Sequence, residues 1–335
     1  MRAALLDRYG TNSGVRLADV PVPSIGETDL LVQVRAASVN PLDVKTRDGQ
    51  VKIVLKYKLP LVMGNDLAGV VTRVGAQVRQ FKIGDEIYAR LDKSRIGAFA
   101  EFAAVRESDA AQKPRNTTFE EAASLPLVAL TSWQALVDIA RLQAGQRVLI
   151  HAGSGGVGSI AIQLAHHLGA TVLTTVGQRN VDLVKRLGAD IAIDYRSTRF
   201  EDVARDCDVV FDSAGGATLV RSFACVKPGG LVVSVGSTPS AAFAREWGMN
   251  PFLVLAIGLM SRKVTAAARA RRARYEYLFM RADGSQLAQI AQLVEGGIIK
   301  PLVDKVFPLE QVRDALTYSE SGRATGKVIV KVASA

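Results

Sequence analysis

The sequence is poor in the residues that bind metals or form disulfides. It has 2 cysteines and 3 histidines in 335 residues, and Cys207 and Cys225 are far from any metal-binding or redox spacing. Structural zinc often takes four cysteines, and catalytic zinc generally takes three nitrogen, sulfur or carboxylate ligands. The scattered cysteines and histidines supply neither set. We therefore expect no zinc, and reduced thiols in a cytoplasmic protein.

Long apolar segments are also missing. Residues 1–10, MRAALLDRYG, carry charges throughout, which argues against a signal peptide. The longest apolar run, Pro251 to Met260, is too short to span a bilayer, so we expect no stable membrane insertion. The net charge is +10, but the basic residues are mostly scattered and no nucleic-acid-reading motif accompanies them. We expect no nucleic-acid partner, and a basic surface that helps to attract an anionic cofactor.

One motif, in residues 147–169, organises the chain. An apolar strand leads into a glycine-rich turn and then into an amphipathic helix, with glycines in the G-x-G-x-x-G spacing. The first glycine permits the sharp turn, the second lets the backbone approach a pyrophosphate, and the third allows close packing of helix on strand. The helix start adds unpaired N–H groups. The predicted dinucleotide-binding residues are Gly153, Ser154, Gly155, Gly156, Val157 and Gly158.

The chain shows two compositional patterns. Residues 1–123 read as short β segments separated by glycine, proline and aspartate, which predicts a partly closed β-barrel-like domain. Beyond residue 124, strands alternate with helices, which predicts a doubly wound parallel sheet of the α/β class. Its strands are expected at 147–152, 171–176, 190–194, 208–212 and 231–235.

The end of the chain is expected to return to the first domain. A helix in residues 285–297 precedes a final strand, GKVIVKV, whose natural neighbours are the early β segments. We therefore predict an outer domain made of residues 1–123 and 283–335, with the nucleotide domain, 124–282, inserted between them.

Residues 250–274 allow two interpretations. The first is a buried helix near the substrate mouth, followed by a solvated Arg-rich helix that leads into a strand. The second is an apolar lid with a basic rim that meets anionic membranes.

The second strand of the nucleotide domain indicates which cofactor binds. NAD enzymes of this fold place an acidic residue at the end of that strand, where it binds the ribose 2′-hydroxyl. Residues 171–181, TVLTTVGQRNV, contain no acid and carry Arg179. A guanidinium without a competing carboxylate suits the 2′-phosphate of NADPH.

The order of motifs resembles that of the medium-chain dehydrogenase/reductase superfamily, and within it the zinc-independent quinone oxidoreductases and enone (2-alkenal) reductases. The resemblance implies a GroES-like outer domain, a Rossmann domain, NADPH-dependent reduction of quinones or activated C=C bonds, and a dimer joined through the Rossmann sheets. The matching stretches include SVNPLDVKTRDG (38–49), GNDLAGVVTRVG (64–75), GAFAEFAAV (97–105), AGSGGVGS (152–159), DVVFDSAGG (208–216) and SGRATGKVIV (321–330).

The resemblance also bears on the metal. Zinc-dependent relatives hold their catalytic zinc with Cys and His from loops that match 38–43 and 64–66. Here Asn40 and Asn65 stand at those places. Asp43 and Asp66 are nearby, but two hard carboxylates without a softer partner make a poor zinc site.

Several polar residues are candidates for catalysis. Asn40 is an uncharged donor and acceptor for the ribose or the substrate oxygen. By resemblance, Lys45 matches an active-site lysine of enone reductases, which could stabilise the enolate or anchor the ribose. Tyr57 is a weaker candidate acid, because its loop could equally be a surface lid. Water could also deliver the proton.

The remaining candidates concern the cofactor. By resemblance, Thr131 matches a threonine near the nicotinamide, while Tyr195 and Arg323 match positions that approach the 2′-phosphate. The segments 212–215 and 235–238 end strands at the carboxyl edge of the sheet, where the ring and its amide should lie. Strand ends thus add Thr175, Ser213 and Gly236 to the predicted cofactor site.

Two other functions stay open at this point. An enoyl-thioester reductase would need an acid over the substrate α-carbon, for which Tyr57 is the only prompt. A nucleotide-regulated protein that binds RNA or a partner without turnover is suggested by the positive charge and the arginines in 269–274.

Overall fold

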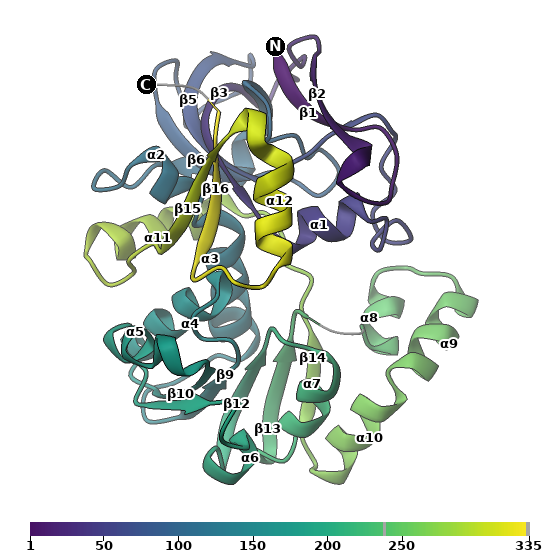
Figure 1. The fold of residues 1–335 in the computed structure, drawn as a ribbon, viewed down its shortest axis with the longest axis vertical. Helices are drawn as coiled ribbons and strands as arrows, with labels where there is room; N and C mark the ends of the chain where they lie inside the picture. Colours follow the sequence, from purple (N-terminus) through teal and green to yellow (C-terminus); the bar gives the residue numbers. More distant parts are fainter. Residues whose placement is uncertain (237–238, 333–335) are drawn as a thin grey trace. The chain divides into compact units, whose positions relative to one another are not determined.

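The computed structural model describes residues 1–236 and 239–332. The chain forms two compact units, one made of Met1–Leu130 with Arg281–Ala335 and the other of Thr131–Met280 (Figure 1). The first unit is therefore discontinuous in sequence. The change of unit at residue 130 falls inside a continuous helix, α3 (Pro126–Trp133), a few residues beyond the expected boundary at 123.

The first unit, called here the outer unit, is built on antiparallel β structure. Its main sheet has the order β15-β16-β3-β5-β6-β8, with β7 also paired to β3. A smaller sheet has the order β2-β1-β4. The bounds are β1 Arg2–Leu6, β2 Val15–Asp19, β3 Asp29–Val39, β4 Leu61–Val62, β5 Asp66–Val74, β6 Glu86–Arg90, β7 Phe102–Arg106, β8 Ala110–Gln112, β15 Val303–Pro308 and β16 Lys327–Lys331.

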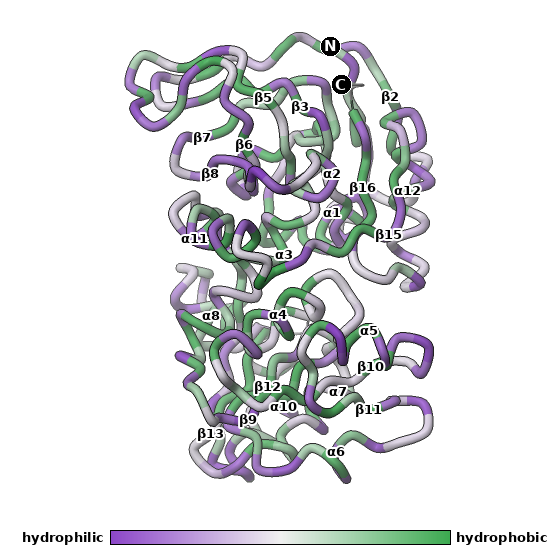
Figure 2. The backbone as a smooth tube through the Cα atoms, turned by 90° about the vertical axis from the view of Figure 1, so that its left-hand side faces the viewer, coloured by the Kyte–Doolittle hydropathy of each residue, from purple (hydrophilic) through white to green (hydrophobic). Residues whose placement is uncertain are grey.

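The last strand closes this unit as the sequence predicted. β16 runs antiparallel to β3, with Val328 opposite Val39 and Val330 opposite Ala37. Both strands are hydrophobic along most of their length (Figure 2). Their apolar side chains join one buried core with Val71 and other residues of the unit, which supplies the free energy that holds the two ends of the chain together.

Four helices complete the outer unit: α1 Pro41–Arg47, α2 Phe119–Ala123, α11 Gly284–Glu295 and α12 Val312–Glu320. α1 begins where the sequence favours a start. Pro41 occupies the first helical position, and the Asp43 carboxylate accepts a hydrogen bond from the backbone N–H of Asn40 at 2.8 Å. This capping contact fixes Asn40 and Asp43 at the end of β3.

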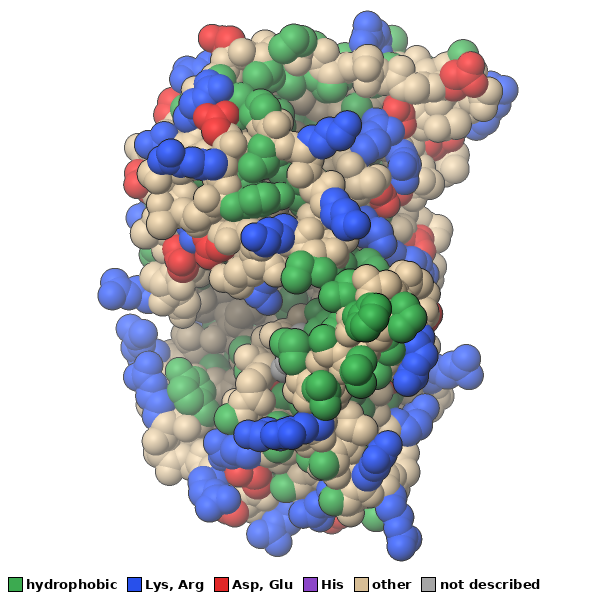
Figure 3. All heavy atoms as spheres, turned by 90° about the vertical axis from the view of Figure 1, so that its right-hand side faces the viewer, with side chains coloured by type: hydrophobic (Ala, Val, Ile, Leu, Met, Phe, Trp, Pro, Cys, Tyr) green, Lys and Arg blue, Asp and Glu red, His purple; other side chains and the backbone are tan. Residues whose placement is uncertain are grey.

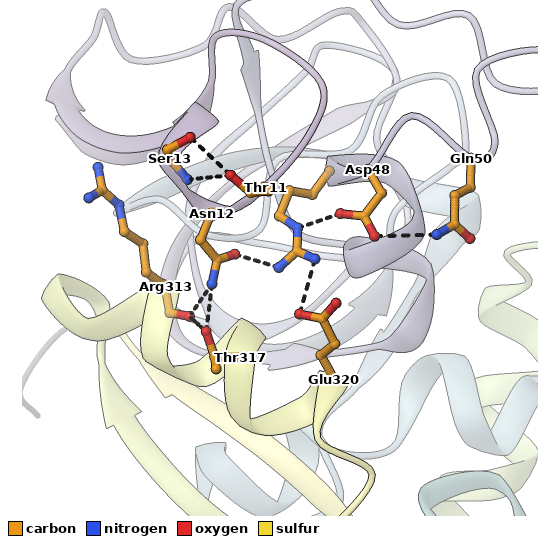
Figure 4. Close-up of polar contacts among 9 residues, drawn as sticks. Thr11, Asn12, Ser13, Asp48, Gln50, Arg313, Thr317 and Glu320 are labelled. Atoms are coloured by element: carbon orange, nitrogen blue, oxygen red, sulfur yellow. Dashed lines mark hydrogen bonds and ion pairs between the residues drawn. The ribbon is translucent and has the colours of Figure 1, made fainter.

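A buried arginine, Arg47, joins α1 to the C-terminal part of the unit, and Figure 4 labels the side chains with which it bonds. The Arg47 guanidinium is 3% exposed and donates to Asp48 at 2.7 Å, to Glu320 at 3.1 Å and to the Asn12 side-chain oxygen. Asn12 in turn donates to the backbone oxygen of Arg313 in α12. The buried charge is thus paired on three sides, which is the condition under which such a charge can be accommodated.

The second unit, called here the nucleotide unit, contains a parallel sheet with the order β11-β10-β9-β12-β13-β14. The bounds are β9 Arg147–Ile150, β10 Thr171–Val176, β11 Ile191–Asp194, β12 Cys207–Asp212, β13 Val226–Ser234 and β14 Arg274–Tyr277. The five predicted strands are confirmed, and β14 at the edge confirms the strand expected after the Arg-rich helix. β10 and β12 lie on opposite sides of β9, so the winding reverses at β9, the place where such sheets bind ligands.

Helices α4 Gly156–His167, α5 Val181–Arg186, α6 Phe200–Val203 and α7 Gly216–Ser222 connect these strands. Helix α4 confirms the predicted helix after the glycine loop. It buries Ile160 and Leu164 as expected, while Leu168 is the helix C-cap and only partly buried.

Between β13 and β14 lie α8 Ala241–Glu246, α9 Pro251–Met260 and α10 Arg262–Ala270. The expectation of a buried helix at 250–260 is wrong, because α9 has no buried residue. A run that is apolar on every face does not indicate which side of the helix is buried, and here the main contacts of α9 are with α8 and α10. The expected solvated helix is present: α10 buries only Val264 and Ala268.

None of the helices in the described residues is by itself long and apolar enough to cross a membrane. α9 and α10 reach that composition only when taken together, and they are bent by 60° at their junction.

Candidate dinucleotide site and buried polar cluster

The glycine loop of the nucleotide unit connects β9 to α4. A side chain at Gly153 would collide with the Thr174 hydroxyl, and one at Gly158 would collide with the backbone oxygen of Ala152. Both positions therefore require glycine for strand and helix to pack this closely. At Gly155, the helix N-cap, the nearest atom to an added Cβ would be the Ala152 oxygen at 3.3 Å. That contact is tight, so a glycine suits this position, where the motif expects the backbone to face a ligand.

The first turn of α4 supplies donors at this loop. The first N–H groups of a helix have no partner within the helix, and here they belong to Gly156, Val157 and Gly158. The aligned peptide dipoles add partial positive charge at the same end. Together these features form a site for a phosphate group.

A pocket of about 520 Å³ opens at the carboxyl ends of β9, β10 and β11. It includes Thr175 and Tyr195 from the predicted set. None of the residues that line it is acidic, and three are arginines. Its lining residues are His151, Ala152, Thr175, Tyr195, Arg196, Ser197, Thr198, Arg199, Phe200, Ala214, Thr218 and Arg221.

The three pocket arginines differ in their partners. Arg221 is held by Glu201 at 2.6 Å and lies over the Phe200 ring. Arg199 contacts Glu201 at 3.5 Å. Arg196 has no carboxylate partner among the described residues and lies over the Tyr195 ring, 5.8 Å from its centroid. Arg196 is thus the pocket arginine whose charge is available to an anion.

Arg196 and Arg199 did not emerge from the sequence. Their only signal is their place after the third strand of this sheet in sequence, where Arg196 directly follows Tyr195 and Arg199 lies four residues beyond it. Arg179, which the sequence favoured, lies exposed in a short 3₁₀ helix after β10 and is not among the residues lining the pocket. Its role in phosphate binding stays a prediction.

His151 and Thr175 form the floor of this pocket. The His151 ring lies within hydrogen-bond distance of the hydroxyls of Thr175 at 3.1 Å and Ser222 at 2.8 Å. Burial lowers the pKa of His151 to about 4, so the ring is neutral at physiological pH. The Thr175 hydroxyl also accepts from the Ala152 N–H, which ties β10 to the glycine loop.

The ends of β12 and β13 are joined by a buried carboxylate. Asp212 accepts hydrogen bonds from the backbone N–H of Gly215 at 3.0 Å and from the Ser234 hydroxyl at 2.7 Å. Ser213 donates to the His151 backbone oxygen at 3.2 Å, and an added side chain at Gly236 would collide with the Ser213 backbone. The two predicted strand-end residues therefore lie side by side. Part of the predicted segment 235–238, namely 237–238, lies outside the described residues.

In the outer unit, Asn40 belongs to a buried polar cluster. Its side-chain oxygen accepts from the Lys327 ammonium at 2.5 Å, and its amide nitrogen donates to Asp66 at 3.0 Å. Lys327 also donates to the Val39 backbone oxygen at 2.9 Å. Burial lowers the pKa of Lys327 and raises that of Asp66, while their mutual attraction opposes both shifts. Asn40 is thus engaged on both atoms of its amide.

Asp43 and Asn65 form the second half of the cluster. The Asn65 amide donates to Asp43 at 2.8 Å, and both side chains are buried. Burial raises the pKa of Asp43 to about 6, despite hydrogen bonds from the Asn40 backbone and Asn65.

These residues do not fit a zinc ion. The two amides that stand in place of Cys and His donate to carboxylates, and the Asn40 oxygen accepts from the Lys327 ammonium. A third ligand with a nitrogen or sulfur lone pair is missing from the cluster. Across the described residues, no group of three or more His, Cys, Asp or Glu side chains is placed to hold a metal.

Arg90, at the end of β6, is a further member of this cluster that the sequence did not reveal. It is 1% exposed and lies opposite Asp66 in the strand pairing. Its Nε and Nη1 have no hydrogen-bond partner among the described residues. Burial lowers the pKa of the guanidinium, while Asp66, Tyr57 and Asp43 favour its charge. The alternation of side chains along a strand predicts that position 90 is buried, but it does not predict that Arg90 faces the Asp66 carboxylate.

The other candidate residues are spread over both units. Lys45 lies half-buried on α1, and its ammonium has no hydrogen-bond or ion-pair partner among the described residues. The Tyr57 hydroxyl donates to the Lys93 backbone oxygen at 2.7 Å, and burial raises the pKa of Tyr57 to about 12. Thr131 is buried in α3 of the nucleotide unit. Arg323 is exposed in the turn between α12 and β16.

Comparison with known proteins agrees with this architecture. Residues 26–115 match the family described as alcohol dehydrogenase GroES-like domain, and residues 187–330 match the family described as zinc-binding dehydrogenase. The mitochondrial NAD(P)H oxidoreductase RTN4IP1 of Bos taurus is 33% identical, over 99% of this chain and 89% of its own. The chain belongs to the medium-chain dehydrogenase/reductase superfamily.

Within this superfamily, the similar proteins include quinone and alkenal/one oxidoreductases. The chloroplastic NADPH-dependent alkenal/one oxidoreductase of Arabidopsis thaliana is 36% identical, over 98% of this chain and 79% of its own. The structure of the quinone oxidoreductase from Coxiella burnetii superposes with a TM-score of 0.87, at 32% identity and with 99% of each chain covered. The GroES-like and Rossmann architecture expected from the sequence is confirmed.

Proposed function

We propose that this protein is an NADPH-dependent reductase that transfers hydride to quinones or to the activated C=C bonds of enones and alkenals, without a metal. One observation carries the proposal: the pocket beside the glycine loop has no acidic lining residue and holds a guanidinium, that of Arg196, with no carboxylate partner. Such a pocket favours an adenosine ribose that bears a phosphate. The relative named NADPH-dependent alkenal/one oxidoreductase supports the same cofactor.

The residues of the nucleotide unit fit this cofactor. The N–H groups at the start of α4 would hold the pyrophosphate, and Gly155 at the helix N-cap would present no side chain to it. Arg196 would pair with the 2′-phosphate, and Tyr195 would bound the same end of the pocket. When bound, NADPH supplies the hydride that reduces the substrate.

The outer unit supplies the polar residues proposed to act on the substrate. Reduction of an enone or quinone creates negative charge on oxygen, which a positive group stabilises. Lys45 carries an ammonium that has no partner among the described residues, so we assign it this role. Asn40 acts as a positioning residue, because both atoms of its amide are already bonded within the cluster.

Tyr57 is a poor proton donor in this arrangement. Its hydroxyl is hydrogen-bonded to a backbone oxygen, and a pKa of about 12 keeps its proton at neutral pH. Water is therefore the proposed proton source. Because Tyr57 was the only prompt for an enoyl-thioester reductase, that alternative receives no support from the structure.

The test measures the oxidation of NADPH and of NADH by the purified protein with a small quinone and with an α,β-unsaturated ketone. Arg196→Ala should raise the KM for NADPH about tenfold, the usual size of a charge-assisted contact, and leave the KM for NADH unchanged. Arg205→Ala, an exposed arginine of the same unit outside the pocket, is the matched control. Equal effects of Arg196→Ala on both cofactors, or none on NADPH, would contradict the assignment.

Arg179→Ala belongs in the same series and should also raise the requirement for NADPH if the loop after β10 reaches the phosphate. Lys45→Ala should lower kcat by about 100-fold with a smaller change in the KM for NADPH, as expected for a group that stabilises developing charge. Lys56→Ala, an exposed lysine nearby in sequence, is its control.

We also propose that the enzyme is a cytoplasmic homodimer that needs no zinc. Elemental analysis of active protein and activity after chelation test the need for zinc, and light scattering tests the homodimer.

A further inference from the structure

Helix α9 presents an apolar surface that no described part of the nucleotide unit covers. Four large side chains are mostly exposed: Phe252 by 85%, Leu255 by 64%, Leu259 by 61% and Met260 by 70%. Soluble proteins often expose single apolar residues, but a contiguous set on one helix marks an interaction surface. These four residues are called here the α9 apolar face.

Basic residues surround this face. Arg245 of α8 lines the groove of about 550 Å³ between α8 and α9, while Arg262 and Lys263 follow Met260 at the start of α10. All three are exposed. In residues 239–280 there are seven Lys and Arg but only two acids, Glu246 and Glu276. Figure 3 shows hydrophobic side chains gathered on the lower half of this view, with Lys and Arg around them.

We propose that α9 and α10 dock on the surface of an anionic lipid bilayer, with the α9 apolar face in the interface and the basic residues against the headgroups. An apolar helix bordered by Lys and Arg is the pattern that binds such interfaces, where apolar burial and electrostatic attraction act together. The 60° bend between the two helices lets α9 enter the interface while α10 stays at the headgroups. The protein lies on the membrane and does not span it.

Charge complementarity favours a bilayer over a second copy of this chain. A twofold contact through the α9 apolar face would bring the same basic residues of both copies together, which is unfavourable for a homodimer. A bilayer that contains phosphatidylserine or phosphatidylglycerol offers negative charge beside apolar acyl chains. The docking does not depend on the reductase activity, so it can be tested without cofactor or substrate.

The test is flotation of the full-length protein with vesicles of phosphatidylcholine containing about 30% phosphatidylserine, and with phosphatidylcholine alone, at about 0.1 M NaCl. The protein should float with the anionic vesicles and bind the neutral ones at least about tenfold less tightly. Phe252→Ser with Leu255→Ser should weaken binding to anionic vesicles at least about tenfold. Arg262→Glu with Lys263→Glu should do the same.

Matched controls distinguish docking through α9 and α10 from nonspecific adsorption to vesicles. Ile83→Ser removes an isoleucine that is 65% exposed in the outer unit, and Arg205→Glu reverses an exposed charge elsewhere in the nucleotide unit. Both should float like the wild type. All of these residues are exposed, so unchanged thermal unfolding of each variant confirms that it is folded.

Three results would overturn the proposal. The first is absence of flotation with anionic vesicles. The second is a dimer in light scattering that Phe252→Ser with Leu255→Ser converts to monomer, because the face would then be covered by a second copy. The third is a pair of results for the variant Phe252→Ser with Leu255→Ser: it still binds RNA in a salt-sensitive way, and its binding to vesicles is the same as that of the wild type.

Discussion

The buried ammonium of Lys327 should stabilise the outer unit strongly. Lys327 is 5% exposed, and its ammonium donates hydrogen bonds to the Asn40 side-chain oxygen at 2.5 Å and to the Val39 backbone oxygen at 2.9 Å. Replacing it in Lys327→Met leaves the buried carboxylates of Asp43 and Asp66 with only Arg90 as a nearby cation. Removing one partner of a buried charge cluster costs about 3–5 kcal/mol. That is a large share of the roughly 5–15 kcal/mol that stabilises a typical protein.

The neighbouring Lys331 provides the control. It lies on the same strand, is 48% exposed, and pairs with Glu120 at 3.2 Å. Lys331→Met should cost no more than about 1 kcal/mol, because exposed ion pairs contribute little. Urea unfolding followed by circular dichroism measures both. Adding Asp66→Asn to Lys327→Met should recover part of the loss, since the uncompensated negative charge is then removed.

A loss below about 1 kcal/mol for Lys327→Met would refute this account of the cluster, because the ammonium would then be no more important than an exposed one. Failure of Asp66→Asn to recover any stability would show that lost packing, and not unpaired charge, explains the effect.

Three other substitutions test separate parts of the structure. Arg47→Ala should destabilise the outer unit by about 3 kcal/mol, because it removes a buried guanidinium that donates to the part-buried side chains of Asp48 and Asn12; urea unfolding at neutral pH measures this. His151→Gln should flatten the dependence of the free energy of unfolding on pH between about 6.5 and 4. The pKa of His151 in the folded state is lowered to about 4, so its contribution to stability is present above pH 6.5 and is lost as the pH falls. Parallel curves of unfolding free energy against pH for the two proteins would argue against the neutral buried ring. Gly158→Ala should abolish binding of NADPH, measured by calorimetry, because its methyl group would collide with the Ala152 backbone oxygen; wild-type affinity would contradict the role of this loop.

The parts of the fold that the sequence predicted are those in which local pattern and chemistry agree. The glycine loop, the five parallel strands and the pairing of β16 with β3 follow from apolar periodicity and from glycine spacing. Gly153 and Gly158 must be glycine for the reason that the motif implies: a side chain would collide with Thr174 at Gly153 and with the backbone at Gly158.

The missed features depend on contacts between distant residues. Nothing in the sequence places Lys327 beside Asn40, because 287 residues separate them and only the pairing of β16 with β3 brings them together. Arg90 meets Asp66 through a similar strand pairing. The error at 250–260 has another cause: an entirely apolar helix carries no periodicity from which its buried side could be inferred.

The most direct test of the central claim uses metal-free protein and NADPH that carries deuterium at the transferring C4 position. With an enone substrate, we expect one deuterium on the β-carbon of the product, read by mass spectrometry, and preference for NADPH over NADH of at least about tenfold. A product without deuterium, or activity that appears only after zinc is added, would contradict the account.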